Sequence, residues 1–352
     1  MKLTCTSKNS LFSIVDSIRF ITTKLPLKVI VASALLIGVT GSMAIDSFVL
    51  TAPSYAKTAS KTKVIAKKNV TAKNAVKFKD AKLEGVIRKK LNIKNGNRLT
   101  LKVLQGVKVL NLSKAGITSL EGIKALRNLT NLDLDTNKIS DLKPLTSLTK
   151  LTTLDLNTNK ISDLKPLASL TKLTTLDLNT NKISDLKPLA GLTKLTDLGL
   201  AYNGISDLKP LANLTNLTGL RLEANGISDL KPLANLTNLT YLGLSLNQIS
   251  NVTLLAGLTN LSTLDLYANK ISDLKPLFGL TKLTTLDLGQ NQISNVTLLT
   301  GLSNLTNLTL SLNQISDVTP LTGLNNLTGL WLYHNPISNC QLLRQELRST
   351  CE

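Results

Sequence analysis

A ladder of asparagines that recurs every 22 residues constrains the fold of most of this chain. Each asparagine lies in the frame L-x-x-L-x-L-x-x-N-x-I. A repeat of this length forms one coil of a solenoid, which cannot bury its own apolar edge and is stable only when neighbouring coils stack on it. The ladder asparagines are Asn137, Asn159, Asn181, Asn203, Asn225, Asn247, Asn269, Asn291, Asn313 and Asn335.

The coil from Leu151 to Lys172 shows what each part of the repeat predicts. The alternation in T-L-D-L-N predicts a short strand, and the proline in S-D-L-K-P-L predicts a tight turn or short 3-10 segment. We expect the amide of Asn159 to bond turn backbone groups that would otherwise be buried without partners, which makes the ladder structural. The residues expected to point inward are Leu151, Leu154, Leu156, Ile161, Leu164, Leu167 and Leu170.

The runs LTKLTTLDLNTNKISDLKPLAS and GITSLEGIKALRNLTNLDL resemble the 22-residue leucine-rich repeats of bacterial internalin-type surface proteins, and the resemblance covers about residues 78–352. It implies an α/β fold: a leucine-rich repeat solenoid, curved like a horseshoe, with a concave parallel β-sheet and short 3-10 or turn segments on the convex side. About eleven coils are expected over residues 108–337. The resemblance also implies a secreted recognition scaffold whose concave sheet binds another macromolecule.

The first 56 residues are typical of a signal peptide. Two lysines precede an apolar run, and P-S-Y-A then offers small residues before a cleavage point at Lys57, with a second cleavage point at Ser42 and Ala44. The alternative is a retained membrane anchor. Sequons of the N-L-T type recur inside the repeats, where crowded glycans would interfere with packing. We therefore expect export by a bacterium, to the periplasm, the cell surface or the medium.

Positive charge is concentrated ahead of the repeats. Residues 57–127 contain 19 Lys or Arg against three acidic residues, whereas residues 128–352 contain 17 of each sign. The stretch 57–77 is expected to be a disordered basic linker. It would either be attracted to an anionic envelope polymer or lipid surface, or act only as a solvated spacer. A nucleic-acid partner is not expected for an exported chain.

Both ends of a solenoid need caps, because a terminal coil otherwise exposes its leucines. Residues 78–107 are expected to form a helical N-terminal cap, with Asp80 at the start of a helix. Residues 338–352 are expected to form the C-terminal cap, with a disulfide between Cys340 and Cys351 in an oxidising compartment. Two free buried thiols are the alternative. The leucines expected to cover the last coil are Leu342, Leu343 and Leu347.

The concave strands are where we expect binding. The only tryptophan and four of the five tyrosines fall at or beside this surface, and such side chains contribute large rigid contact areas to interfaces. They gather in coils that also contain small glycines. The alternative is that single exposed aromatics on a strand face have no function. The candidate binding residues are Tyr202, Arg221, Glu223, Tyr241, Tyr267, Trp331, Tyr333 and His334.

Catalysis and cofactors are not expected. Asp133, Asp155 and Asp177 should stack at the strand spacing, and a calcium ion there is one interpretation, solvated carboxylates the other. A glycosidase would use paired carboxylates, but no repeat carries an insertion that would build a pocket. His334 is the only histidine, and the sequence offers no nucleophile constellation and no glycine-rich phosphate loop.

The sequence therefore predicts a secreted or envelope-associated, non-enzymatic, monomeric protein without a cofactor, which recognises a protein or glycan on its concave sheet. One alternative is a structural envelope spacer held to anionic polymers by its basic linker. Another is an intracellular regulatory scaffold of leucine-rich repeats.

Overall fold

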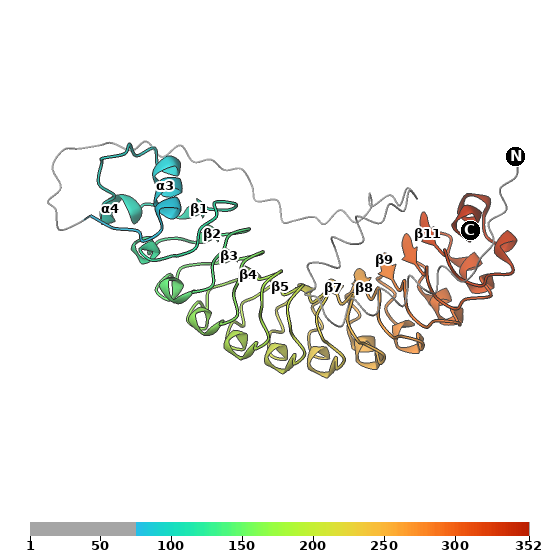
Figure 1. Ribbon diagram of the computed structural model, residues 1–352. Helices are drawn as coiled ribbons and strands as arrows, with labels where there is room; N and C mark the ends of the chain where they lie inside the picture. Colours follow the sequence, from blue (N-terminus) through green and yellow to red (C-terminus); the bar gives the residue numbers. More distant parts are fainter. Residues whose placement is uncertain (1–74, 352) are drawn as a thin grey trace, which may run out of the picture. The chain divides into compact units, whose positions relative to one another are not determined.

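The computed structural model describes residues 75–351 of the protein. The expected signal peptide and the expected basic linker up to residue 74 lie outside the described residues. The described residues belong to one compact unit, which begins at Lys68. Within this unit the strands line the inner side of a curved array of coils, and short 3-10 segments line its outer side (Figure 1).

Eleven three-residue strands form one parallel sheet in this part of the chain, in the sequential order β1 to β11. Each residue pairs with the residue 22 positions on, as Leu154 does with Leu176. Side chains alternate along a strand, so each strand buries its middle leucine and leaves its two outer residues on the concave face. This confirms the expected fold. The strands are β1 (Val109–Asn111), β2 (Asn131–Asp133), β3 (Thr153–Asp155), β4 (Thr175–Asp177), β5 (Asp197–Gly199), β6 (Gly219–Arg221), β7 (Tyr241–Gly243), β8 (Thr263–Asp265), β9 (Thr285–Asp287), β10 (Asn307–Thr309) and β11 (Gly329–Trp331).

Each coil turns back through a 3-10 helix on the convex side. In nine of the ten such helices a polar residue two positions earlier accepts the first backbone N–H: Asp141 Oδ1 accepts from Lys143 N at 2.9 Å, and Asn251 Oδ1 accepts from Thr253 N at 2.9 Å. Aspartate and asparagine are therefore interchangeable at this position. The 3-10 helices of the coils are η2 (Ile123–Ala125), η3 (Lys143–Leu145), η4 (Lys165–Leu167), η5 (Lys187–Leu189), η6 (Lys209–Leu211), η7 (Lys231–Leu233), η8 (Thr253–Gly257), η9 (Lys275–Leu277), η10 (Thr297–Gly301) and η11 (Thr319–Gly323).

The core is a continuous column of leucine and isoleucine. All seven residues expected to point inward from the coil Leu151–Lys172 are at most 1% exposed. Beside this column, Asn159 Oδ1 accepts the N–H of Ile139 at 3.0 Å, and its Nδ2 lies 3.0–3.1 Å from three backbone carbonyl oxygens, one of them that of Leu134 in the preceding coil. Each ladder asparagine thus joins its own turn to the coil before it.

The N-terminal cap is held to the first coil by one carboxylate. Helix α3 (Ala81–Lys90) begins after Asp80, whose Oδ1 accepts the N–H of Lys82 at 2.8 Å. Its Oδ2 accepts from the backbone N–H and the hydroxyl of Thr118 at 2.7 and 2.9 Å. The second helix of the cap is α4 (Leu101–Leu104). None of the described helices is long and apolar enough to cross a membrane.

The C-terminal cap consists of two 3-10 segments, η12 (Cys340–Leu342) and η13 (Gln345–Cys351). Cys340 and Cys351 are paired as a disulfide, with their Cα atoms 6.4 Å apart. Leu343 and Leu347 are buried against the last coil. The expectation that Leu342 also covers this coil is wrong: its side chain lies at the end of the short segment and is 50% exposed.

A residue in left-handed backbone conformation precedes every ladder asparagine. Its φ lies between 51° and 60° in all ten coils that carry the asparagine. These residues are not glycines, although such a conformation costs most L-residues about 1–2 kcal/mol. Their surroundings therefore impose the turn, and the side chains leave the coil at the edge of the concave sheet. They include Thr136, Thr158, Thr180, Tyr202, Ala224, Leu246, Ala268, Gln290, Leu312 and His334.

Candidate functional site on the concave sheet

Three columns of side chains cover the concave face. The first column consists of the first residue of each strand, the second of its last residue, and the third of the residue two positions after that last residue. From β2 to β9 these columns carry eight carboxylates and one basic residue, Arg221. The carboxylates are Asp133, Asp135, Asp155, Asp177, Asp197, Glu223, Asp265 and Asp287.

Five of these carboxylates form the acidic column, defined as Asp133, Asp155, Asp177, Asp265 and Asp287. Each accepts the backbone N–H two residues on, at 2.9–3.0 Å. This turn was not predicted from the sequence; its signal is the aspartate or asparagine that ends six of the eleven strands. Asn111 makes the same bond to the N–H of Ser113 at 3.2 Å, so the turn does not require a charge.

The carboxylates of the acidic column are electrostatically unfavourable in their ionised form. Burial raises the pKa of Asp155 to about 7; the N–H of Asn157 opposes that rise, and the neighbouring aspartates add to it. Burial also raises the pKa of Asp287 to about 7, and the charge of Asp265 contributes. The pKa values of Asp133, Asp177 and Asp265 are raised as well, mainly by burial.

The middle of the face carries a second arrangement, the central cluster, defined as Tyr202, Arg221, Glu223, Tyr241 and Tyr267. The Tyr241 hydroxyl donates to Glu223 Oε1 at 3.1 Å. The Arg221 guanidinium lies over the Tyr241 ring, 5.0 Å from its centroid, in a cation–π contact. Strand β6 supplies Arg221, and β7 supplies Tyr241, so the contact joins adjacent strands.

Glu223 is only partly satisfied. Its Oε2 is buried and has no hydrogen-bond partner within the described residues. Burial raises the pKa of this carboxyl, and the charge of Asp265 adds to the rise. A buried polar atom without a partner is uncommon in a folded protein and calls for a physical explanation. Here it marks a carboxylate whose bonding capacity is unused.

The glycines of the face do not leave open space above the sheet. A Cβ atom at Gly243 would collide with the Glu223 carboxylate, and one at Gly219 would lie 2.9 Å from Asp197 Oδ1. At Gly199 it would lie 2.8 Å from Asn179 Nδ2. Each glycine therefore accommodates a polar side chain from the preceding coil, which lies flat on the sheet.

The predicted binding residues fall into two groups. The central cluster spans the coils of β5 to β8, with Tyr241 and Tyr267 half-buried and Tyr202 39% exposed at the left-handed edge position. Trp331, Tyr333 and the exposed His334 belong to the coil of β11, three strands beyond β8. The structure does not bring these two groups together.

No described group of three acidic, histidine or cysteine side chains has a geometry that could hold a metal ion. The calcium interpretation of Asp133, Asp155 and Asp177 therefore has no structural support. One oxygen of each is already used by a backbone N–H.

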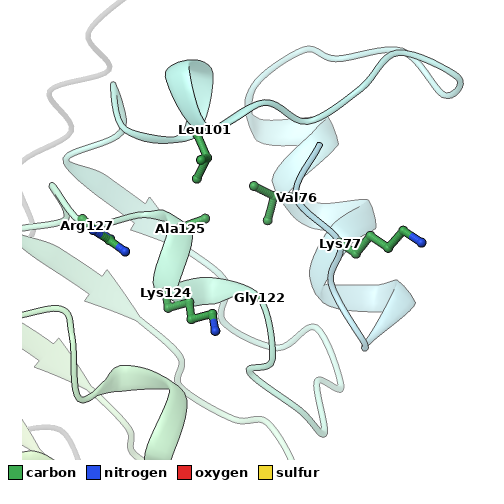
Figure 2. A pocket seen from close by; sticks show the side chains of 7 residues that line it. All are labelled: Val76, Lys77, Leu101, Gly122, Lys124, Ala125 and Arg127. Atoms are coloured by element: carbon green, nitrogen blue, oxygen red, sulfur yellow. The ribbon is translucent and has the colours of Figure 1, made fainter. Parts of the chain in front are cut away.

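A shallow hollow lies away from the sheet, between the N-terminal cap and the first coil (Figure 2). Val76, Leu101 and Ala125 surround it, and Lys77 and Arg127 extend away from it on opposite sides. Its cations do not converge on a common point. The concave sheet is therefore the better candidate site.

Comparisons with known proteins agree with this architecture. The chain matches the family described as Leucine Rich repeats (2 copies) over residues 105–147, 149–191, 193–235, 237–279 and 281–323. No curated protein matches it.

Solved structures share the fold. An internalin (InlF) from Listeria monocytogenes is 35% identical, with 78% of this chain and 94% of that chain covered and a TM-score of 0.64. Internalin C2 from the same species is 36% identical, with 69% and 100% covered and a TM-score of 0.54. The Arabidopsis receptor kinase HAESA ectodomain, solved in complex with a peptide hormone ligand, is 25% identical, with 64% and 42% covered and a TM-score of 0.57.

Proposed function

We propose that this chain, which belongs to the leucine-rich repeat family in its internalin-like class, is an exported, non-enzymatic protein that binds another protein through its concave sheet. The observation that carries the proposal is the central cluster. The coils that begin at Leu195 and Leu217 differ at only four positions, all on the concave face or at its edge. In the second of these coils, Arg221 and Glu223 contact Tyr241 of the next strand. Residues that serve only the solenoid would not need these differences.

The chemistry of the face supports binding rather than catalysis. It offers half-buried tyrosines, which contribute large rigid areas at low entropic cost, and the charge of the partly buried Glu223 carboxylate lies beside them. The polar side chains lie flat on a smooth sheet and do not enclose a reacting group. The HAESA ectodomain, with the same fold, was solved with a peptide ligand. A polypeptide is thus the ligand that we favour over a glycan.

Export accounts for the cysteines. Cys340 and Cys351 can remain paired only where the surroundings are oxidising, as they are outside the bacterial cytoplasm. A mature chain that begins at Lys57 would retain this pair and lose the third cysteine, Cys5. Amino-terminal sequencing of the exported fraction tests this step, and recovery of the intact chain from the cytoplasm alone would favour the intracellular scaffold instead.

The binding test compares the wild-type chain with a variant that carries alanine at Tyr202, Tyr241 and Tyr267. Both are used to capture partners from a bacterial envelope extract at high salt. We expect the variant to lose a partner that the wild type retains. A matched control replaces Leu254 and Leu298, exposed leucines of the convex segments η8 and η10, with alanine and should retain it. A separate Trp331→Ala variant shows whether the last coil takes part.

The second candidate function is the envelope spacer. The coils that begin at Leu148 and Leu170 are nearly identical. This favours the spacer, because residues that recognise a ligand would be expected to differ from coil to coil. A spacer held by its basic linker would be captured equally by all variants and released by salt. That result would contradict binding through the concave sheet.

A further inference from the structure

We propose that the concave sheet takes a cationic polypeptide segment, whose lysine or arginine side chains meet the acidic column at two places and whose middle lies against Glu223, Tyr241 and Tyr267. This inference rests on the proposed function, because it names the chemistry of the partner that the same face binds.

The negative charge of the concave face has little positive charge near it. The three columns carry eight carboxylates against Arg221. Among residues 75–351, no carboxylate of this face has a lysine or arginine nitrogen within 4.0 Å; the two close ion pairs, Arg88–Glu84 and Arg344–Glu346, lie in the caps. Carboxylates on adjacent parallel strands lie about 4.8 Å apart, and such like-charged neighbours destabilise a sheet. A ligand that brings positive charge relieves this repulsion.

Glu223 has a charge that is only partly satisfied. Tyr241 satisfies one of its oxygens, and the other is buried and has no partner among residues 75–351. Arg221 is held over the Tyr241 ring and forms no ion pair with Glu223. A cation that docks beside Tyr241 would lie close to the Glu223 charge, whose attraction is strong because the carboxylate is largely removed from water.

The rest of the coil surface is mixed in sign. On the convex side each K-P-L lysine stands two residues after an aspartate. Residues 128–352 carry equal numbers of basic and acidic residues, so the acidic excess of the concave face is matched by a basic excess elsewhere in that range. The acidic excess is therefore local to the concave face, where it attracts a cationic ligand at short range.

The spacing of the acidic column predicts the pattern of the partner. Asp133, Asp155 and Asp177 occupy β2 to β4, and Asp265 and Asp287 occupy β8 and β9. The four strand steps from Asp177 to Asp265 correspond to about 19 Å. An extended chain covers this distance with about six residues. The partner segment should therefore carry two basic groups separated by about six residues.

The test uses a synthetic peptide with two blocks of three lysines separated by six glycine and serine residues, titrated into the full chain. The concave variant carries Asn at Asp155, Asp177, Asp265 and Asp287. Asparagine preserves the turn bond, as Asn111 shows. We expect the peptide to bind about tenfold more weakly to this variant.

The control is a convex variant with Asn at Asp163, Asp185, Asp207 and Asp229. It changes the net charge by the same amount, and Asn251 and Asn295 show that asparagine serves equally well there. We expect its affinity to change by less than about twofold, because these charges lie on the far side of the sheet. A Glu223→Gln variant should also bind more weakly than the wild type.

Several outcomes would overturn the proposal. An equal loss of peptide affinity in the concave and convex variants would show that only the net charge of the protein matters. Equal binding of a peptide with glutamate in place of lysine would show that the face has no preference for positive charge. Displacement of the peptide by calcium, but not by magnesium at equal ionic strength, would make a metal ion the occupant. Self-association that depends on the four concave aspartates would make a second copy of this chain the occupant of the face. Loss of an envelope partner in the tyrosine variant would still support the proposed function in each case.

Discussion

The Glu223 carboxylate lies over Gly243 in the adjacent strand, in the space that a Cβ atom at that position would occupy. The central cluster thus lies directly on the sheet backbone. Because Gly243 has no side chain, the charge of Glu223 can be held against that backbone.

Replacing Gly243 with alanine should displace Glu223 with little effect on stability. The added methyl group meets the end of a flexible side chain, so we expect the free energy of unfolding to change by less than about 1 kcal/mol. The hydrogen bond from Tyr241 should break. Since the charge of Glu223 helps to raise the Tyr241 pKa, spectroscopic titration should show that this pKa falls.

Gly279→Ala is the matched control, because a Cβ atom there has no neighbour within 4 Å. It should leave the tyrosine titration and lysine-peptide binding as in the wild type. An unchanged titration in Gly243→Ala would show that Glu223 does not depend on the glycine.

The Asn159→Ala substitution should destabilise the array by about 3 kcal/mol. It removes the acceptor of the Ile139 N–H and the donor to three carbonyl oxygens, all of them in turns that water cannot reach easily. Urea unfolding measures the change. The control is Asn216→Ala, whose exposed amide makes one bond, to the Thr193 carbonyl at 2.8 Å, and should cost about 1 kcal/mol or less. Similar costs for both would contradict a special role of the ladder.

Stability should decrease as the pH rises through 7. The pKa of Asp155 is about 7 in the folded protein and 3.8 as an ordinary aspartate, so the folded state binds more protons between these values. Its contribution is fully present below about pH 4 and is lost as the pH rises through 7. The groups that act on it are Asp133, Asp135, Asp177 and the N–H of Asn157.

Urea unfolding at several pH values from 5 to 8 measures this dependence. Together with Asp287, whose folded pKa is also about 7, we expect a loss on the order of 5 kcal/mol over that interval. A variant with asparagine at Asp155 and Asp287 should be less sensitive to pH. The convex Asp163→Asn variant should behave like the wild type; if it also flattens the dependence, the acidic column is not the cause.

Reduction of the disulfide should destabilise the C-terminal cap. The two cysteines are 11 positions apart in sequence. Because the cross-link restricts the unfolded chain, we expect it to contribute about 2–3 kcal/mol to the free energy of unfolding. Unfolding in the presence and absence of a reductant measures the difference. A variant with serine at both cysteines should show the lower stability in both conditions, and any remaining response to the reductant would mean that the bond is not responsible.

The 22-residue period was sufficient to predict the sheet, the buried leucines and the bonds of the ladder asparagines, because burial and backbone bonding act in the same way in every coil. The local geometry of the candidate site was not predictable in this way. Nothing in the identity of Tyr202 or His334 indicates a left-handed backbone, since the ladder turn imposes it on any residue there. The position of Glu223 over Gly243 depends on two residues 20 positions apart, and its effect on Tyr241 depends on their distance in space.

The bonds of the ladder asparagines also bear on how such a chain can change in length. Asn159 reaches back to Leu134 and Ile139 and no farther, and the strands pair only with their immediate neighbours. A whole coil can therefore be duplicated or deleted between two similar coils, such as those that begin at Leu148 and Leu170, and the coils on either side would still make the same kinds of contact. Evolution can lengthen this protein in single steps that each widen the sheet by one strand, and the distance between the two acidic groups can be adjusted in the same steps.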